Sequence, residues 1–145
     1  MKPIHILLVE DNAGDILLIT EALEESKIIN RVSSVKNGKE AIDFVFQQNE
    51  FKDVDRPDLI LLDINLPLKN GHEVLQAIKS EIKTKHIPVI MLTTSSSDED
   101  VIKSYKEHAN SYITKPLDVT EFIKAISTIE DFWLNIVRLP SKAQN

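Results

Sequence analysis

The chain has 145 residues and a mass of 16.5 kDa, which suits one domain that buries about two-thirds of its unfolded surface. Hydrophobic residues make up 42% and charged residues 28%, and the net charge of −6 argues against nonspecific binding to nucleic acid or to an anionic membrane. Because cysteine is absent, disulfides and thiolate metal sites are excluded.

Two further observations concern the compartment. No apolar run is long enough to cross a membrane, and the opening MKPIHILLVEDN becomes acidic too early for a signal peptide. We therefore expect a soluble cytoplasmic protein with no membrane contact.

The first half of the chain alternates short apolar runs with segments of helical periodicity. Residues 4–9 (IHILLV) predict a buried strand, residues 14–26 a helix, and residues 31–35 a weaker strand. A second helix is predicted over 38–48. Four of its apolar residues are expected to face inward: Ala41, Ile42, Val45 and Phe46.

The middle of the chain repeats the pattern. Residues 49–57 (NEFKDVDRP) are predicted to form a surface loop. Residues 59–63 (LILLD) follow as an unbroken apolar run, which indicates a strand buried on both faces. A helix over 72–82 and a strand over 88–93 complete this part.

The last third predicts a helix over 97–108, a short strand over 111–114 and a final helix over 118–137. Five strand–helix units in one domain indicate a parallel sheet with helices on both faces. With five strands, the doubly wound order 2-1-3-4-5 is favoured, and its ligand crevice lies between the first and third strands.

Polar residues follow the predicted strands at the edge where that crevice would lie. The first strand leads into Glu10 and Asp11, the third ends in Asp63, the fourth in Thr93, and the fifth leads into Lys115. Each residue alone has an ordinary explanation as a helix cap, a turn residue or a solvated side chain. Together they would place three carboxylates, a hydroxyl and an ammonium in one crevice.

Such a cluster needs a compensating positive charge. Two carboxylates ~5 Å apart repel by about 3 kcal/mol at an effective dielectric near 20. A hard divalent cation, Mg²⁺, is the natural partner of an all-oxygen acidic site. A free carboxylate beside Mg²⁺ suits phosphoryl transfer onto that carboxylate, with Asp63 as nucleophile and with Lys115 and Thr93 binding phosphoryl oxygens.

Four segments in order resemble the receiver domain of two-component response regulators, over residues 4 to about 130. They are ILLVEDN, LILLDINLPLKNG, PVIMLTT and SYITKP. The resemblance implies a flavodoxin-like (βα)5 fold, a partner histidine kinase and phosphorylation of Asp63. It further implies that Lys115 binds the phosphoryl group and that Thr93 and Tyr112 form a switch pair. The Mg²⁺ ligands it implies are Glu10, Asp11, Asp63 and the backbone carbonyl of Asn65.

Two departures from the usual receiver-domain sequence, together with the C-terminal tail, suggest a subgroup of this family. His108-Ala109 stands where many members have Gly-Ala, and Asn70-Gly71 stands where they often have Asp-Gly. With the tail FWLNIVRLP, the chain resembles the small single-domain regulators linked to phytochrome-type kinases. We expect a receiver domain over 1–130 and, over 131–145, an extension of the last helix and a short tail, without an output domain. Signalling by protein contact is then expected, or alternatively the passing on of phosphate within a phosphorelay.

Two enzyme or cofactor-binding alternatives fit less well. A Mg²⁺-dependent aspartyl-phosphate phosphatase normally places a second Asp two residues after its nucleophile, where this chain has Asn65. A flavodoxin needs a phosphate-binding loop where EDNAGD is acidic. We therefore expect a phosphoacceptor signalling protein and no enzymatic activity other than self-catalysed phosphoryl transfer and autodephosphorylation. The four histidines are expected to be structural.

The final predicted helix is longer than the strands it would cover, and its apolar stripe continues to the end. Left uncovered, this stripe would expose a large apolar surface. It could fold back onto the core or contact the kinase, but a symmetric dimer is favoured. We predict a homodimer through four residues of this stripe: Phe132, Trp133, Ile136 and Val137.

Overall fold

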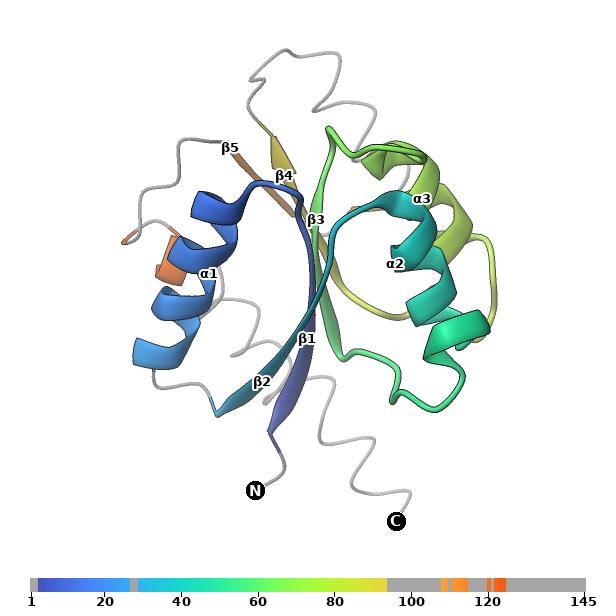
Figure 1. Cartoon of the computed structure of the whole chain (residues 1–145), viewed down its shortest axis with the longest axis horizontal. Coiled ribbons are helices and arrows are strands. Elements are labelled where there is room, and N and C mark those ends of the chain that lie inside the picture. The colour runs from blue at the N-terminus through green and yellow to red at the C-terminus, as the bar shows by residue number, and fades with distance from the viewer. Residues whose placement is uncertain are drawn as a thin grey trace.

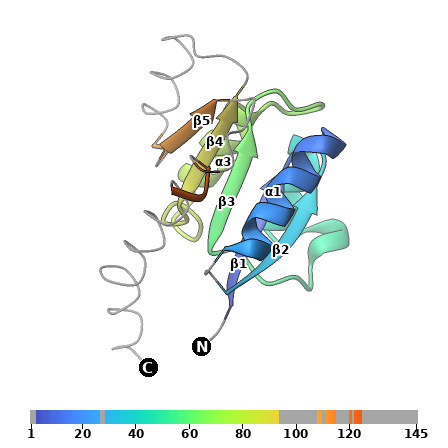
Figure 2. The same cartoon turned by 90° about the vertical axis from the view of Figure 1, so that its left-hand side faces the viewer.

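The computed structural model describes residues 3–26, 29–93, 108–109, 111–114, 120 and 122–124. Its core is a five-stranded parallel sheet in the order β2-β1-β3-β4-β5 (Figures 1 and 2), which confirms the predicted fold. The strands are β1 (Ile4–Val9), β2 (Asn30–Val35), β3 (Leu59–Asp63), β4 (Val89–Thr93) and β5 (Ser111–Thr114).

Helices cover both faces of the sheet. Helix α1 (Ala13–Glu25) lies on one face, and α2 (Gly38–Val45) and α3 (Gly71–Lys79) lie on the other (Figure 1). Each face has its own apolar cluster, because alternate residues of the central strands point to opposite sides. All five residues of β3 and of β4 are buried, as expected for strands that run between two helical layers.

The helices α1, α2 and α3 begin in the same way. In each, an asparagine side chain accepts a hydrogen bond from the backbone N–H three residues later, which satisfies one of the unpaired donors of the first turn. The caps are Asn12, Asn37 and Asn70. At α3, Glu73 also reaches back to the Asn70 backbone and completes a capping box.

Two predicted helices end earlier than expected. Helix α2 stops at Val45, because Gln47 adopts a left-handed backbone conformation (φ 55°). Phe44 is therefore the buried aromatic residue of α2, and Phe46 is only half-buried. Helix α3 stops at Lys79, and the buried hydroxyl of Thr84 donates to the Ile78 carbonyl at 2.7 Å as the chain turns away.

The segment 49–57 is not the plain surface loop that was predicted. It contains the 3₁₀ helix η1 (Asn49–Phe51), and the Phe51 ring packs against Phe44 with centroids 5.2 Å apart. The Gln47 side chain donates to the Val54 carbonyl at 2.8 Å. These contacts give the connection a small apolar core that the polar sequence does not reveal.

Most of the predicted helices 97–108 and 118–137 lie outside the described residues. Within the second, residues 120 and 122–124 are helical, and Phe122 is buried in the apolar cluster on the α1 face. No helix in the described part of the chain is long and apolar enough to cross a membrane.

Candidate metal centre

Three carboxylates meet at the edge of the sheet where the parallel strands end. Glu10 directly follows β1, Asp11 is the next residue, and Asp63 is the last residue of β3. The pairing of Val9 with Leu62 aligns the two strand ends, so Glu10 comes level with Asp63. One carboxylate oxygen from each of the three residues lies within 4.8 Å of the others.

The burial of these acids is unequal. Glu10 is completely buried and Asp63 is 4% exposed, whereas Asp11 is exposed to solvent. Oε2 of Glu10 accepts hydrogen bonds from the backbone N–H groups of Asp11 and Asn12, both at 3.1 Å. The start of α1 therefore holds the Glu10 carboxylate in place, while Asn12 rather than either acid caps the helix.

The loop after β3 fixes Asp63 from the other side. Oδ1 of Asp63 accepts the Asn65 backbone N–H at 2.9 Å, and the Gly71 N–H donates to the Ile64 carbonyl at 2.8 Å. The chain thus makes a tight return from β3 into α3. Asn65 lies exposed directly beside the carboxylates, and the role of its carbonyl as a metal ligand stays a prediction.

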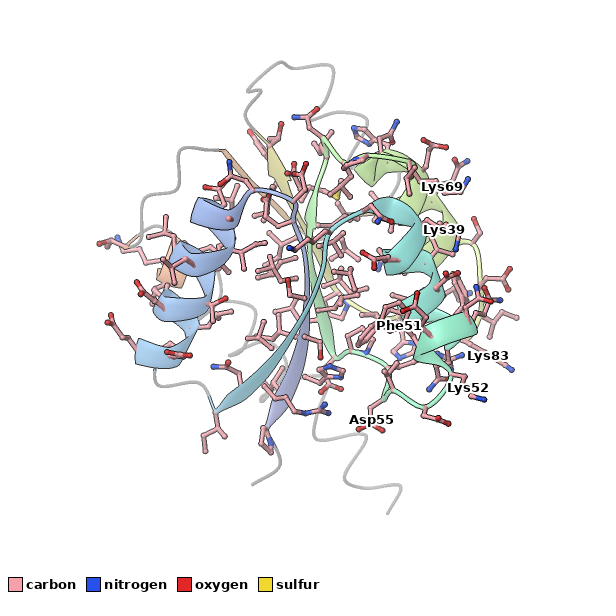
Figure 3. All side chains as sticks on the ribbon, in the orientation of Figure 1. Lys39, Phe51, Lys52, Asp55, Lys69 and Lys83 are labelled. Atoms are coloured by element: carbon pink, nitrogen blue, oxygen red, sulfur yellow. The ribbon has the colours of Figure 1, made fainter. Side chains whose placement is uncertain are left out.

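Two glycines permit this return, and sequence reasoning missed their role. A Cβ on Gly71 would lie 2.4 Å from the Asp63 carbonyl oxygen, and a Cβ on Gly38 would lie 1.9 Å from the Lys69 carbonyl oxygen. Both distances are far below van der Waals contact. Figure 3 shows Lys39 and Lys69 on the side of the molecule where α2 meets this loop. The repeated Asn-Gly pair at the starts of α2 and α3 was the available signal.

The two residues of the predicted switch pair lie on neighbouring strands. Thr93 ends β4 and is buried, and Tyr112 of β5 is half-buried against the α2–α3 side of the core. Tyr112 pairs with Met91, which points to the same face as Thr93 two residues later. The two side chains are therefore diagonal neighbours on one face of the sheet.

Several of the predicted site and interface residues lie outside the part of the chain that the structure describes. Lys115 lies outside the described residues, as do the four residues of the predicted interface, Phe132, Trp133, Ile136 and Val137. The described part of the site is therefore its acidic part with the Thr93 hydroxyl.

The donor set of this cluster fits a hard divalent cation. Three carboxylates in close contact repel one another, and bound Mg²⁺ or Mn²⁺ would relieve that repulsion through oxygen ligands. The exposed Asp11 gives the site access to solvent, while Glu10 and Asp63 are held by the strand ends. The arrangement can thus bind a cation and present a carboxylate to an incoming group.

Comparison with known proteins places the chain among signalling proteins. It matches the family model of the response regulator receiver domain over residues 6–127. It is 45% identical to response regulator Rcp1 of Synechocystis sp., over 96% of this chain and 95% of that protein.

Solved structures agree with this match. The structure of a phosphorylated cyanobacterial phytochrome response regulator, RcpA, superposes with a TM-score of 0.81 at 46% identity. A Mn²⁺-bound form of Rcp1 superposes with a TM-score of 0.81 at 45% identity. Each comparison covers 92% of this chain and 96% of the other.

Proposed function

Because the chain belongs to the response regulator receiver domain family, we propose that Asp63 accepts a phosphoryl group from a partner histidine kinase. The observation that carries this proposal is the carboxylate cluster of Glu10, Asp11 and Asp63, in which Asp63 ends a fully buried strand. Phosphorylation then adds about −1.5 to −2 charges at a buried position, which is a strong local signal. The phosphorylated chain signals by contact with another protein.

The transfer step is a nucleophilic substitution at phosphorus. An oxygen of the ionised Asp63 attacks the phosphorus of a phosphohistidine, the P–N bond breaks, and its electron pair returns to the imidazole nitrogen. The product is an acyl phosphate on Asp63. Oδ1 of Asp63 accepts the Asn65 backbone N–H and Asp11 faces solvent, so the nucleophile is oriented before the donor arrives.

The cation proposed for this site is Mg²⁺. The carboxylates of Glu10, Asp11 and Asp63 would hold it with the backbone carbonyl of Asn65, as the family resemblance implies. When bound, Mg²⁺ neutralises charge on the phosphoryl oxygens. We assign phosphoryl binding to Lys115 and Thr93, and self-catalysed transfer and autodephosphorylation to the same site.

The kinase is proposed to be of the phytochrome-linked class. RcpA, at 46% identity, is described as a cyanobacterial phytochrome response regulator. A second structure that supports this is the bacteriophytochrome response regulator RtBRR, which is 41% identical and covers 87% of this chain. Similarity over this length supports a shared kind of partner.

Domain extent and oligomeric state complete the proposal. We assign the receiver domain to residues 1–130, and residues 131–145 to an extension of the last helix and a short tail. The chain forms a homodimer through Phe132, Trp133, Ile136 and Val137, because these apolar residues follow helical spacing. Sedimentation should show a dimer for the wild type and a monomer for Trp133→Asp; a monomeric wild type at tens of micromolar would end this part of the proposal.

The phosphoacceptor assignment is tested with a small acyl-phosphate donor and Mg²⁺. The wild type should gain one base-labile phosphoryl group, measured by intact mass, and excess chelator should prevent the reaction. Asp63→Asn should abolish it, whereas Asp53→Asn, an exposed aspartate away from the cluster, should leave it unchanged. Equal labelling of Asp63→Asn and the wild type would overturn the assignment.

A further inference from the structure

A cavity lies at the end of the sheet opposite the carboxylates. It has a volume of about 610 Å³, and its described lining residues are Lys79, Lys85, His86 and His108. Lys79 ends α3, Lys85 and His86 precede β4, and His108 precedes β5. Because the strands are parallel, these positions lie at the edge where strands begin, whereas Asp63 and Thr93 lie where strands end. We call the cavity lined by these four residues the basic cavity.

The described residues that line this cavity are all basic. Each described lining residue carries an ammonium or an imidazole, and none of them carries a carboxylate. The chain as a whole has a net charge of −6, so this grouping runs against the overall composition. Basic groups gathered around one cavity favour an anionic ligand.

Lys79 is held as a fixed donor at this cavity. Its Nζ donates to the carbonyl oxygens of Lys85 at 3.0 Å and of Ile87 at 2.6 Å. An ammonium has three N–H donors, and two of them are used by these carbonyls among the described residues. Burial lowers the pKa of Lys79, so a bound anion would stabilise a charge that the protein interior disfavours.

A purely structural role would account for Lys79 but not for the other three residues. Lys79 closes the connection from α3 to β4, and its charge complements the carboxyl end of α3. Lys85, His86 and His108, however, are exposed and yet border the same cavity. Their convergence from two separate connections needs a further explanation.

The backbone of His108 supports a ligand-binding role. Its φ is 70°, in the left-handed region that glycine adopts without strain. A histidine there places an imidazole at the cavity where a glycine would fit the backbone better. Strained non-glycine residues of this kind gather at functional sites.

We propose that the basic cavity binds a small anion that carries two or more phosphate groups. Ammonium groups are well suited to phosphate oxygens, and several basic groups at one cavity suit several phosphates better than one carboxylate. The volume falls in the range of about 300–1,000 Å³ that is usual for small-ligand sites. No Phe, Tyr or Trp is among the described lining residues, which favours recognition of the phosphates rather than stacking on a nucleobase.

The four histidines make this proposal directly measurable. The full chain is titrated with inorganic pyrophosphate at constant pH and ionic strength, with chelator present so that no cation bridges pyrophosphate to the carboxylate cluster. The imidazole proton signals of His86 and His108 should shift and saturate, with a dissociation constant below about 1 mM. The signals of His5 and His72, which are buried elsewhere, should stay in place as internal references.

Matched variants distinguish binding at a specific site from nonspecific electrostatic attraction. Lys85→Gln should weaken binding about threefold to fivefold, in line with loss of one exposed charge contact. Lys83→Gln removes the same charge from the same turn but outside the cavity lining, and it should change affinity less than about twofold (Figure 3 labels Lys83). Acetate at equal ionic strength should not produce saturable shifts.

Three results would overturn the proposal: shifts that do not saturate, equal shifts of all four histidines, or equal weakening by the two lysine substitutions. Saturable binding of acetate as tight as that of pyrophosphate would exclude the preference for several phosphates. The test needs no phosphorylation of Asp63, so its outcome is independent of the proposed phosphoacceptor function.

Discussion

Gly71 lies so close to Asp63 that a Cβ on the glycine would stand 2.4 Å from the Asp63 carbonyl oxygen and 2.6 Å from Cα of Ile64. The residue that begins α3 therefore contacts the backbone of the proposed phosphoacceptor. Since the clash is with backbone atoms, no rotation of a side chain can relieve it. The stability of the site and the identity of residue 71 are thus directly linked.

The first prediction concerns this contact. Gly71→Ala should lower the free energy of unfolding by about 1–3 kcal/mol, because the added methyl group forces backbone shifts. It should also slow phosphorylation of Asp63. Gly14→Ala is the control, since its Cβ would meet a side-chain oxygen of Asn12 at 3.3 Å. Urea unfolding of both variants is the measurement, and equal stabilities would contradict the close approach at Gly71.

The second prediction concerns the metal. Asp11→Asn should weaken Mg²⁺ binding about tenfold or more, because affinity depends on the number of charged ligands. Glu21→Gln, which removes an exposed charge from α1 outside the cluster, should leave it nearly unchanged. Isothermal titration with Mg²⁺ measures both. If the two variants bind alike, Asp11 is not a ligand.

The third prediction concerns the switch pair. Thr93→Ala should still be phosphorylated but should lose much of the response at Tyr112, because the hydroxyl can no longer approach the phosphoryl group. Thr93→Ser keeps a hydroxyl and should retain that response. Tyr112 ring signals, followed by NMR on phosphorylation, distinguish the variants. An undiminished response in Thr93→Ala would remove Thr93 from the switch.

The fourth prediction concerns pH. His5 is buried in β1, where desolvation, with a smaller contribution from Arg31, lowers its pKa from the ordinary value of 6.5. Because the unfolded chain then binds more protons, stability is present above pH 6.5 and is lost as pH falls below it. The slope approaches about 1.4 kcal/mol per pH unit for one group.

The test for His5 is a comparison of urea unfolding at about pH 7.5 and about pH 5.5. His5→Gln keeps a hydrogen-bonding side chain for Ser33 but does not titrate, so it should lose less stability between the two conditions. His86→Gln, at an exposed histidine, should behave like the wild type. An equal loss in wild type and His5→Gln would show that other groups cause the acid sensitivity.

The fifth prediction concerns the loop between β3 and α3. Leu68 has a φ of 69° and is 75% exposed. Its backbone is therefore strained, and its side chain buries too little apolar surface to offset that strain. Leu68→Asn should raise the free energy of unfolding by about 0.5–1 kcal/mol, since asparagine tolerates the left-handed region. Leu17→Asn, at an exposed leucine within α1, should lower it instead because asparagine is a poor helix former. Thermal or urea unfolding measures whether each substitution raises or lowers the free energy of unfolding.

Local patterns in the sequence were enough to predict the architecture of the domain. The unbroken apolar run of β3 and the helical spacing of α1 are set by which faces must be buried, and burial follows a fixed period along each element. Five such units leave few possible topologies, so the strand order could also be predicted. The order of Glu10, Asp11, Asp63 and Thr93 along the chain indicated which edge of the sheet would carry the site.

Only the tertiary structure decided how the distant segments meet. The left-handed turn at Gln47 ends α2 earlier than its apolar pattern suggests, and the folding of Phe51 onto Phe44 converts an apparent loop into part of the core. The distance between the Glu10 and Asp63 carboxylates depends on the register of β1 against β3. The basic cavity combines the end of α3 with the connections into β4 and β5. Such contacts join residues far apart in the chain, and no local period encodes them, because they depend on packing between complete elements.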